Sequence, residues 1–69
     1  MTDREIRAYL RGATRERVLS GWYHYERFEE REWIVSTPFT GAQVYDQAGV
    51  EDYCRALASA GIEPLPIAA

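Results

Sequence analysis

The segment from Ser20 to Val35 constrains the fold most, because it concentrates the residues that favour β-structure. It contains both tryptophans, two of the five tyrosines, the single histidine and four of the eleven acids. Aromatic and β-branched residues crowd it while charges gather near its middle, a pattern that predicts an antiparallel hairpin. From Val18 to Glu26 large side chains occupy both alternating sets of positions, so we expect one aromatic row to be exposed or half covered.

The same pattern sets the limits of the strands. Glu29 and Glu30 are expected to make the turn, and residues 32–37 to return as the second strand, which Pro38 ends. Thr40-Gly41 is a turn signal, and residues 42–45 are enough for a short third strand.

A helix is predicted before the hairpin. Thr2 and Glu5 have the spacing of a capping box, and apolar residues follow at three- and four-residue intervals at Ile6, Tyr9, Leu10 and Ala13. We expect this helix to end at Gly12, because polar residues stand where the apolar stripe would continue. Asp3 lies four residues before Arg7, the favourable order for an ion pair.

A second helix is predicted from about Gln47 to Ala60, with Asp46 as its N-cap. One face carries Val50, Tyr53, Cys54, Leu57 and Ala58. Gly61 suits the left-handed position after the helix, with Leu57 and Ile62 placed for the apolar contact of a Schellman motif. Residues 62–67 contain two prolines and are expected to be extended. The sequence thus predicts a single α+β domain over residues 1–69, in the order helix, three strands, helix (αβββα).

Length and composition exclude several classes of protein. A chain of 69 residues has room for one modest core, and its 46% apolar residues are too many for a disordered tail and too evenly spread for a membrane span. One cysteine and one histidine cannot form an internal disulfide or a structural zinc site. The free thiol and the absence of an apolar leader favour the cytoplasm of a bacterial host cell, with no membrane partner.

No catalytic site is predicted. A nucleophilic thiol needs a neighbouring cation or a helix N-terminus to lower its pKa, whereas Cys54 falls midway along the apolar face of a helix. His24 is expected to be a residue of a strand surface. The hairpin glutamates lie near a turn, where no cleft is expected. The five glycines are isolated, which excludes a phosphate-binding loop. We expect a protein that is not an enzyme and needs no cofactor or metal.

The charge is uneven along the chain. Residues 1–20 carry a net +2 and residues 21–69 a net −5, within a total of −3. Arg4, Arg7 and Arg11 line the first helix and are a candidate nucleic-acid-binding face, although the overall negative charge makes direct binding to nucleic acid the weaker alternative.

The acidic hairpin is the stronger candidate for a binding site. Its carboxylates alternate with large aromatic side chains of the kind that anchor protein interfaces. The predicted partner-binding residues are Tyr23, Tyr25, Glu26, Glu29, Glu30, Glu32 and Trp33. Such a surface suits a basic protein or ribonucleoprotein, whose nucleic-acid groove accepts carboxylates in place of phosphates. Two alternatives remain open: a turn that only confers solubility, and a homodimer formed through exposed aromatics.

In size, acidity, compactness and lack of catalytic residues, the chain resembles the small phage-encoded inhibitors, anti-CRISPR proteins among them. The resemblance covers the general character of the whole chain and involves no signature residues. It implies a stoichiometric inhibitor, without a cofactor, that binds a CRISPR effector complex at a nucleic-acid-binding surface. Those proteins share no common fold, so the resemblance adds nothing to the predicted architecture.

Overall fold

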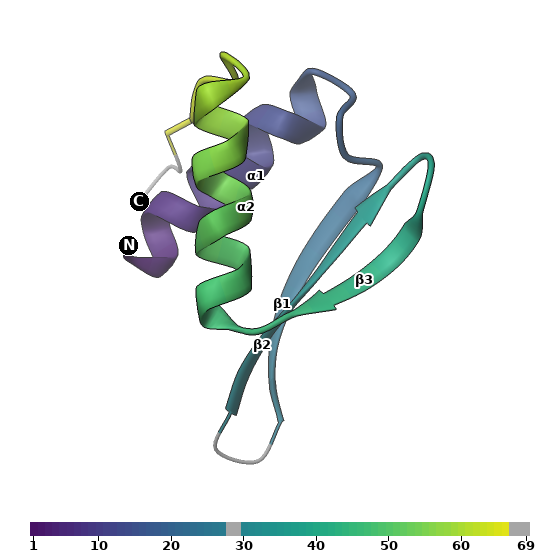
Figure 1. Cartoon of the computed structure of the whole chain (residues 1–69), viewed down its shortest axis with the longest axis vertical. Coiled ribbons are helices and arrows are strands. Elements are labelled where there is room, and N and C mark those ends of the chain that lie inside the picture. Colours follow the sequence, from purple (N-terminus) through teal and green to yellow (C-terminus); the bar gives the residue numbers. More distant parts are fainter. Residues whose placement is uncertain (28–29, 67–69) are drawn as a thin grey trace.

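The protein is an αβββα domain with both helices on one side of a three-stranded sheet (Figure 1). The computed structural model describes residues 1–27 and 30–66. The elements are α1 (Asp3–Arg15), β1 (Gly21–Arg27), β2 (Glu30–Thr37), β3 (Gly41–Tyr45) and α2 (Gln47–Ser59). The predicted α+β class and element order are confirmed.

The sheet is antiparallel, with β2 in the centre and β1 and β3 at its edges. β1 and β2 start and end close to the predicted limits, but Glu30 belongs to β2 and not to the turn, and Val18 precedes β1. Glu29 lies outside the described residues. The β1–β2 hairpin extends away from the helices at one end of the sheet, and the β2–β3 turn lies at the other end (Figure 1).

Helix α1 begins as predicted and ends later than predicted. The Thr2 hydroxyl accepts the Glu5 N–H at 3.2 Å, and the Thr2 N–H donates to the Glu5 carboxylate at 3.0 Å. These bonds with Thr2 hold the pKa of Glu5 below its ordinary value of 4.5. The predicted end at Gly12 is wrong, because α1 runs on to Arg15. Arg17 then takes the left-handed conformation, with φ of 62°, that a glycine would adopt without strain.

Gly12 has a tertiary role instead. It is buried, and a Cβ built on it would overlap the Glu63 carbonyl oxygen and lie 3.1 Å from the Glu63 carbonyl carbon. The chain after α2 therefore crosses α1 at this residue, where only glycine leaves room. The Leu65 N–H donates to the Ala8 carbonyl at 2.9 Å and fixes the crossing.

Helix α2 begins at the predicted residue and ends at Ser59, one residue before the predicted end, and Ala58 of its predicted apolar face is exposed. The Asp46 carboxylate accepts the Gly49 N–H at 2.7 Å, as an N-cap does. At the other end Gly61 has φ of 87°, and the Ile62 N–H donates to the Leu57 carbonyl at 3.0 Å, which completes the predicted Schellman motif.

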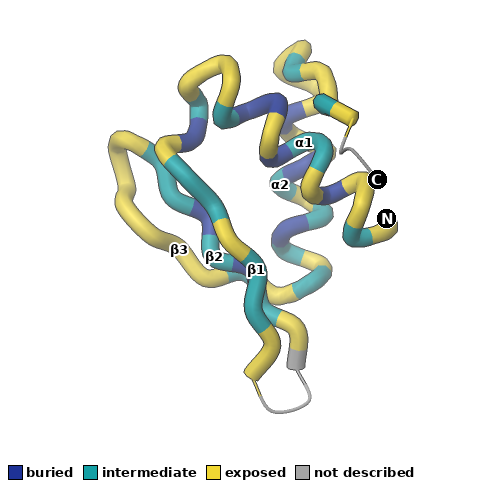
Figure 2. Tube along the Cα trace, turned by 180° about the vertical axis from the view of Figure 1, so that it is seen from behind, coloured by how far each residue is buried: buried dark blue, intermediate teal, exposed yellow. Residues whose placement is uncertain are grey.

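The core lies between the helices and the inner face of the sheet, which carries Trp33 and Val35 of β2. Both residues are buried, with exposed fractions of 0% and 1%. The remaining buried apolar residues are Ile6, Leu10, Ala13, Leu19, Val50, Cys54 and Leu57. Figure 2 shows these buried segments facing one another across the helix–sheet boundary. In the described ranges 1–27 and 30–66 no helix is long and apolar enough to cross a membrane.

Candidate functional site

The face of the sheet that points away from the helices is the first candidate surface. Strand residues alternate between faces, and Trp33 and Val35 point toward the core, so their neighbours in β2 point outward. The register places Tyr23, Ile34 and Val44 side by side, one from each strand, and pairs Tyr25 with Glu32. We call these five residues the outer face.

The outer face combines exposed apolar area with a carboxylate. Tyr23 is 56% exposed and Val44 59% exposed, and Ile34 lies between them. The Tyr25 hydroxyl donates to the Glu32 carboxylate at 2.9 Å. That hydrogen bond raises the pKa of Tyr25 above its ordinary value of 10.0 and holds the carboxylate at a fixed position beside the apolar row. The outer face therefore places a row of adjacent apolar side chains next to a carboxylate that is held by a hydrogen bond.

The hairpin glutamates do not all lie on this face. Glu26 pairs with Arg31 across β1 and β2, which places it on the inner side, and its carboxylate lies 3.4 Å from the Arg31 Nε. Arg31 also pairs with Asp3 of α1. The predicted Asp3–Arg7 ion pair is thus replaced by one that ties α1 to the hairpin. The side chains of Glu29 and Glu30 lie outside the described residues.

Trp33 is not available to a partner, contrary to its predicted place in the binding surface. Its ring is fully buried, lies 4.2 Å from the His24 ring between centroids, and donates its Nε1–H to the Gln47 side chain at 3.2 Å. The sequence could not distinguish the two aromatic rows, because both alternating sets of positions carry large residues. The row of Tyr23 and Tyr25 faces outward, and the row of Trp22 and His24 faces the helices.

The arginines of α1 form a separate face. Arg4, Arg7 and Arg11 are all exposed, on the side of the helix away from the apolar stripe of Ile6, Leu10 and Ala13. Asp3 and Glu5 lie in the first turn of the same helix, so α1 is not uniformly basic. These carboxylates weaken the attraction of the helix for a phosphate backbone.

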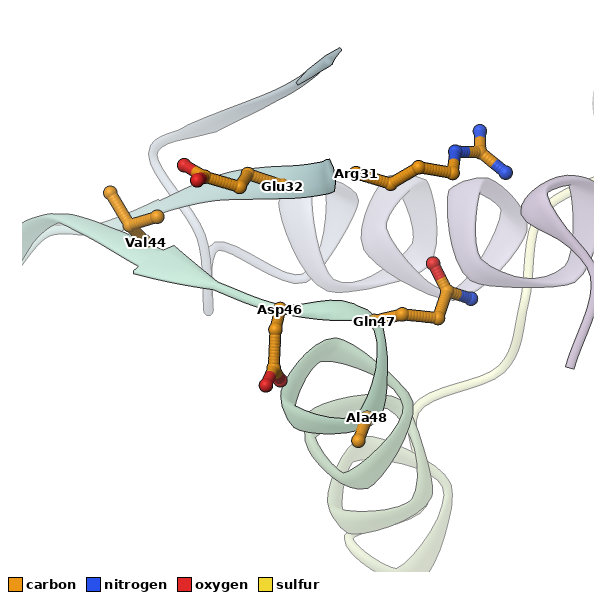
Figure 3. Close-up of a pocket in the computed structure, with 6 residues that line it drawn as sticks. All are labelled: Arg31, Glu32, Val44, Asp46, Gln47 and Ala48. Atoms are coloured by element: carbon orange, nitrogen blue, oxygen red, sulfur yellow. The ribbon is translucent and has the colours of Figure 1, made fainter. Parts of the chain in front are cut away.

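An open hollow of about 670 Å³ lies where the end of β3 meets the start of α2 (Figure 3). Its lining residues are Arg31, Glu32, Val44, Asp46, Gln47 and Ala48. Arg31 and Glu32 point in opposite directions, and each charged group already has a structural partner: Asp3 for Arg31, Tyr25 for Glu32 and the α2 N-terminus for Asp46. The hollow adjoins the outer face at Glu32 and Val44 and the inner side of the sheet at Arg31, and the residues that line it present no acid–base pair.

The remaining chemistry-bearing residues serve the core. Cys54 is fully buried, and burial raises the pKa of its thiol to about 11, which disfavours the thiolate at neutral pH. His24 contacts Arg31 at 3.3 Å and stacks on Trp33. Among residues 1–27 and 30–66, no three His, Cys, Asp or Glu side chains are grouped as metal ligands.

Phe39 and Val44 are exposed apolar residues that sequence reasoning missed. Phe39 is 92% exposed in the turn between β2 and β3. Its position after Pro38, at the predicted end of a strand, was the available signal, because connecting segments lie mostly at the surface. Val44 sits in a strand whose two faces the sequence did not distinguish.

No protein-family model, curated protein or solved structure matches the chain. The surface itself is therefore the basis for a functional proposal.

Proposed function

We propose that the protein is a non-enzymatic binding protein that holds a basic protein or ribonucleoprotein partner against the outer face of its sheet. The observation that carries this proposal is the uncovered row of Tyr23, Ile34 and Val44 beside the fixed carboxylate of Glu32. Tyrosines anchor interfaces at low entropic cost, and carboxylates at the border select for cationic partners.

The charge distribution supports a cationic partner. The chain carries −3 overall, and residues 21–69, which contain the sheet, carry −5. Such a charge raises the rate of encounter with a basic surface and repels nucleic acid itself. In its most specific form the proposal is an inhibitor of the anti-CRISPR type, which occupies the nucleic-acid-binding surface of an effector complex and excludes its nucleic acid.

Affinity capture from a host lysate, followed by mass spectrometry, tests the proposal with three matched variants. Tyr23→Ser alters the outer face, Glu29→Arg/Glu30→Arg reverses two of the charges that the sequence predicts for partner binding, and Arg7→Ala/Arg11→Ala alters the far side of α1. We expect a basic partner that the wild type and the α1 variant retain and the other two lose. A partner retained equally by all four proteins would refute the outer face as the site.

A second candidate function is binding to nucleic acid through Arg4, Arg7 and Arg11, which are exposed together. It predicts retention on DNA that falls steeply with salt and is lost in the Arg7→Ala/Arg11→Ala variant. The same capture experiment separates the two functions, because each depends on a different variant.

A further inference from the structure

The free edge of β3 is unprotected. β3 lies at the edge of the sheet, and in Figures 1 and 2 no element of the described chain lies along the side of β3 that faces away from β2. Edge strands in soluble proteins usually carry charges, prolines or bulges that prevent further pairing. β3 reads Gly-Ala-Gln-Val-Tyr, has no charged residue or proline, and pairs with β2 without a bulge. The opposite edge, β1, carries Glu26 and Arg27.

The strand is also complementary to itself. In an antiparallel pair of two copies, the register that uses all five residues places Gln43 opposite Gln43 and Ala42 opposite Val44. Small residues then face large ones on the outer side, and Gly41 faces Tyr45 on the inner side. In this register the odd-numbered residues of one copy lie opposite the odd-numbered residues of the other, and opposite residues point to the same face of the sheet. The helices of both copies therefore lie on the same side of the joined sheet.

We propose that β3 pairs with β3 of a second copy around a two-fold axis at Gln43, joining two sheets into one of six strands. The contact is isologous, as in most homodimers. The pairing satisfies outward backbone groups of both strands and brings the apolar rows of both outer faces onto one continuous surface. A domain of this size gains stability from association, since its own core is small. The inference does not rest on the proposed function.

The axis position supplies a sharp test. Gln43 is exposed, so Gln43→Glu and Gln43→Lys leave the core intact, and each places two like charges opposite one another across the axis. Ala56→Glu, on the exposed side of α2, adds the same charge as Gln43→Glu away from β3 and serves as the control. Circular dichroism verifies that each variant is folded.

Sedimentation equilibrium over about a hundredfold range of concentration measures association, which follows mass action. We expect the wild type and Ala56→Glu to approach twice the 7.9 kDa of one chain. Each Gln43 variant is expected to raise the dissociation constant about fivefold or more, and an equimolar mixture of the two to restore it as a heterodimer. A wild type that stays at 7.9 kDa throughout overturns the proposal. A dimer that neither Gln43 variant weakens overturns it too.

Discussion

Replacing Gly12 with alanine separates helix propensity from tertiary packing. In an exposed helix interior, alanine in place of glycine stabilises by about 1 kcal/mol. Gly12, however, is buried beneath the chain after α2, and an added Cβ would overlap the Glu63 carbonyl oxygen and lie 3.5 Å from Ile62 Cγ2. Ordinary carbon–oxygen contacts begin near about 3.3 Å, so the segment must move by about 1 Å or more.

That movement lowers the free energy of unfolding, because it breaks a hydrogen bond and withdraws an apolar side chain from the core. The Leu65 N–H to Ala8 carbonyl bond, 2.9 Å long, is held by the crossing, and losing it costs about 1 kcal/mol. Ile62 packs against the core, and withdrawing about half of such a side chain costs about 1 to 1.5 kcal/mol more. After the gain in propensity, Gly12→Ala is expected to destabilise by about 1 to 1.5 kcal/mol, which lowers the melting temperature by about 4 to 12 °C.

Thermal unfolding followed by circular dichroism measures the change, and hydrogen exchange of the Leu65 amide locates it. Gly21→Ala is the matched control, since the same methyl group there has no atom within 4 Å. A Gly12→Ala protein that is as stable as the wild type, with the Leu65 amide equally protected, would show that the crossing does not constrain the helix.

Three further predictions follow from single residues. Arg17→Gly should raise stability by about 0.5 to 1 kcal/mol in urea unfolding, because it relieves a left-handed residue at φ of 62°; unchanged or lower stability contradicts this. Cys54 should react with thiol reagents about a hundredfold more slowly in the native than in the unfolded protein, given its burial and its pKa of about 11; rapid native labelling counts against the placement. Glu32→Gln should lower the pKa of Tyr25 toward 10.0 in an NMR titration. Because the folded pKa is raised, the stabilisation from this hydrogen bond is present below pH 10.0 and is lost as pH rises through the Tyr25 pKa, and an unshifted titration in the variant would exclude the contact.

The parts of the fold that local chemistry decides were predictable. The Thr2 and Asp46 caps, the glycine after α2 and the order of elements depend on residues close together in the chain, and the structure has all of them. The end of α1 was not predictable, because Gly12 makes room for the backbone carbonyl of Glu63, a residue far away in the sequence. A glycine that ends a helix and one that admits a neighbouring chain look alike in a sequence.

The candidate surface was predictable only in part. The sequence indicated that one aromatic row would be exposed, and the row of Tyr23 and Tyr25 is at least partly so. Which row faces the helices depends on how the sheet packs, and this is why buried Trp33 was included among the predicted partner-binding residues. The pairing of Arg31 with Asp3 and Glu26 joins three elements and has no local signature.

The one-sided placement of the helices divides the sheet into two sets of positions under different selection. Substitutions at Trp33 and Val35 change the packing of the core and destabilise the fold, whereas substitutions at Tyr23 and Val44 leave the packing of the core unchanged. A lineage of this protein can therefore change the residues of the outer face while it keeps the same scaffold. Variants selected for folding alone should lose their aromatic outer-face residues, and variants selected for the proposed partner binding should retain them.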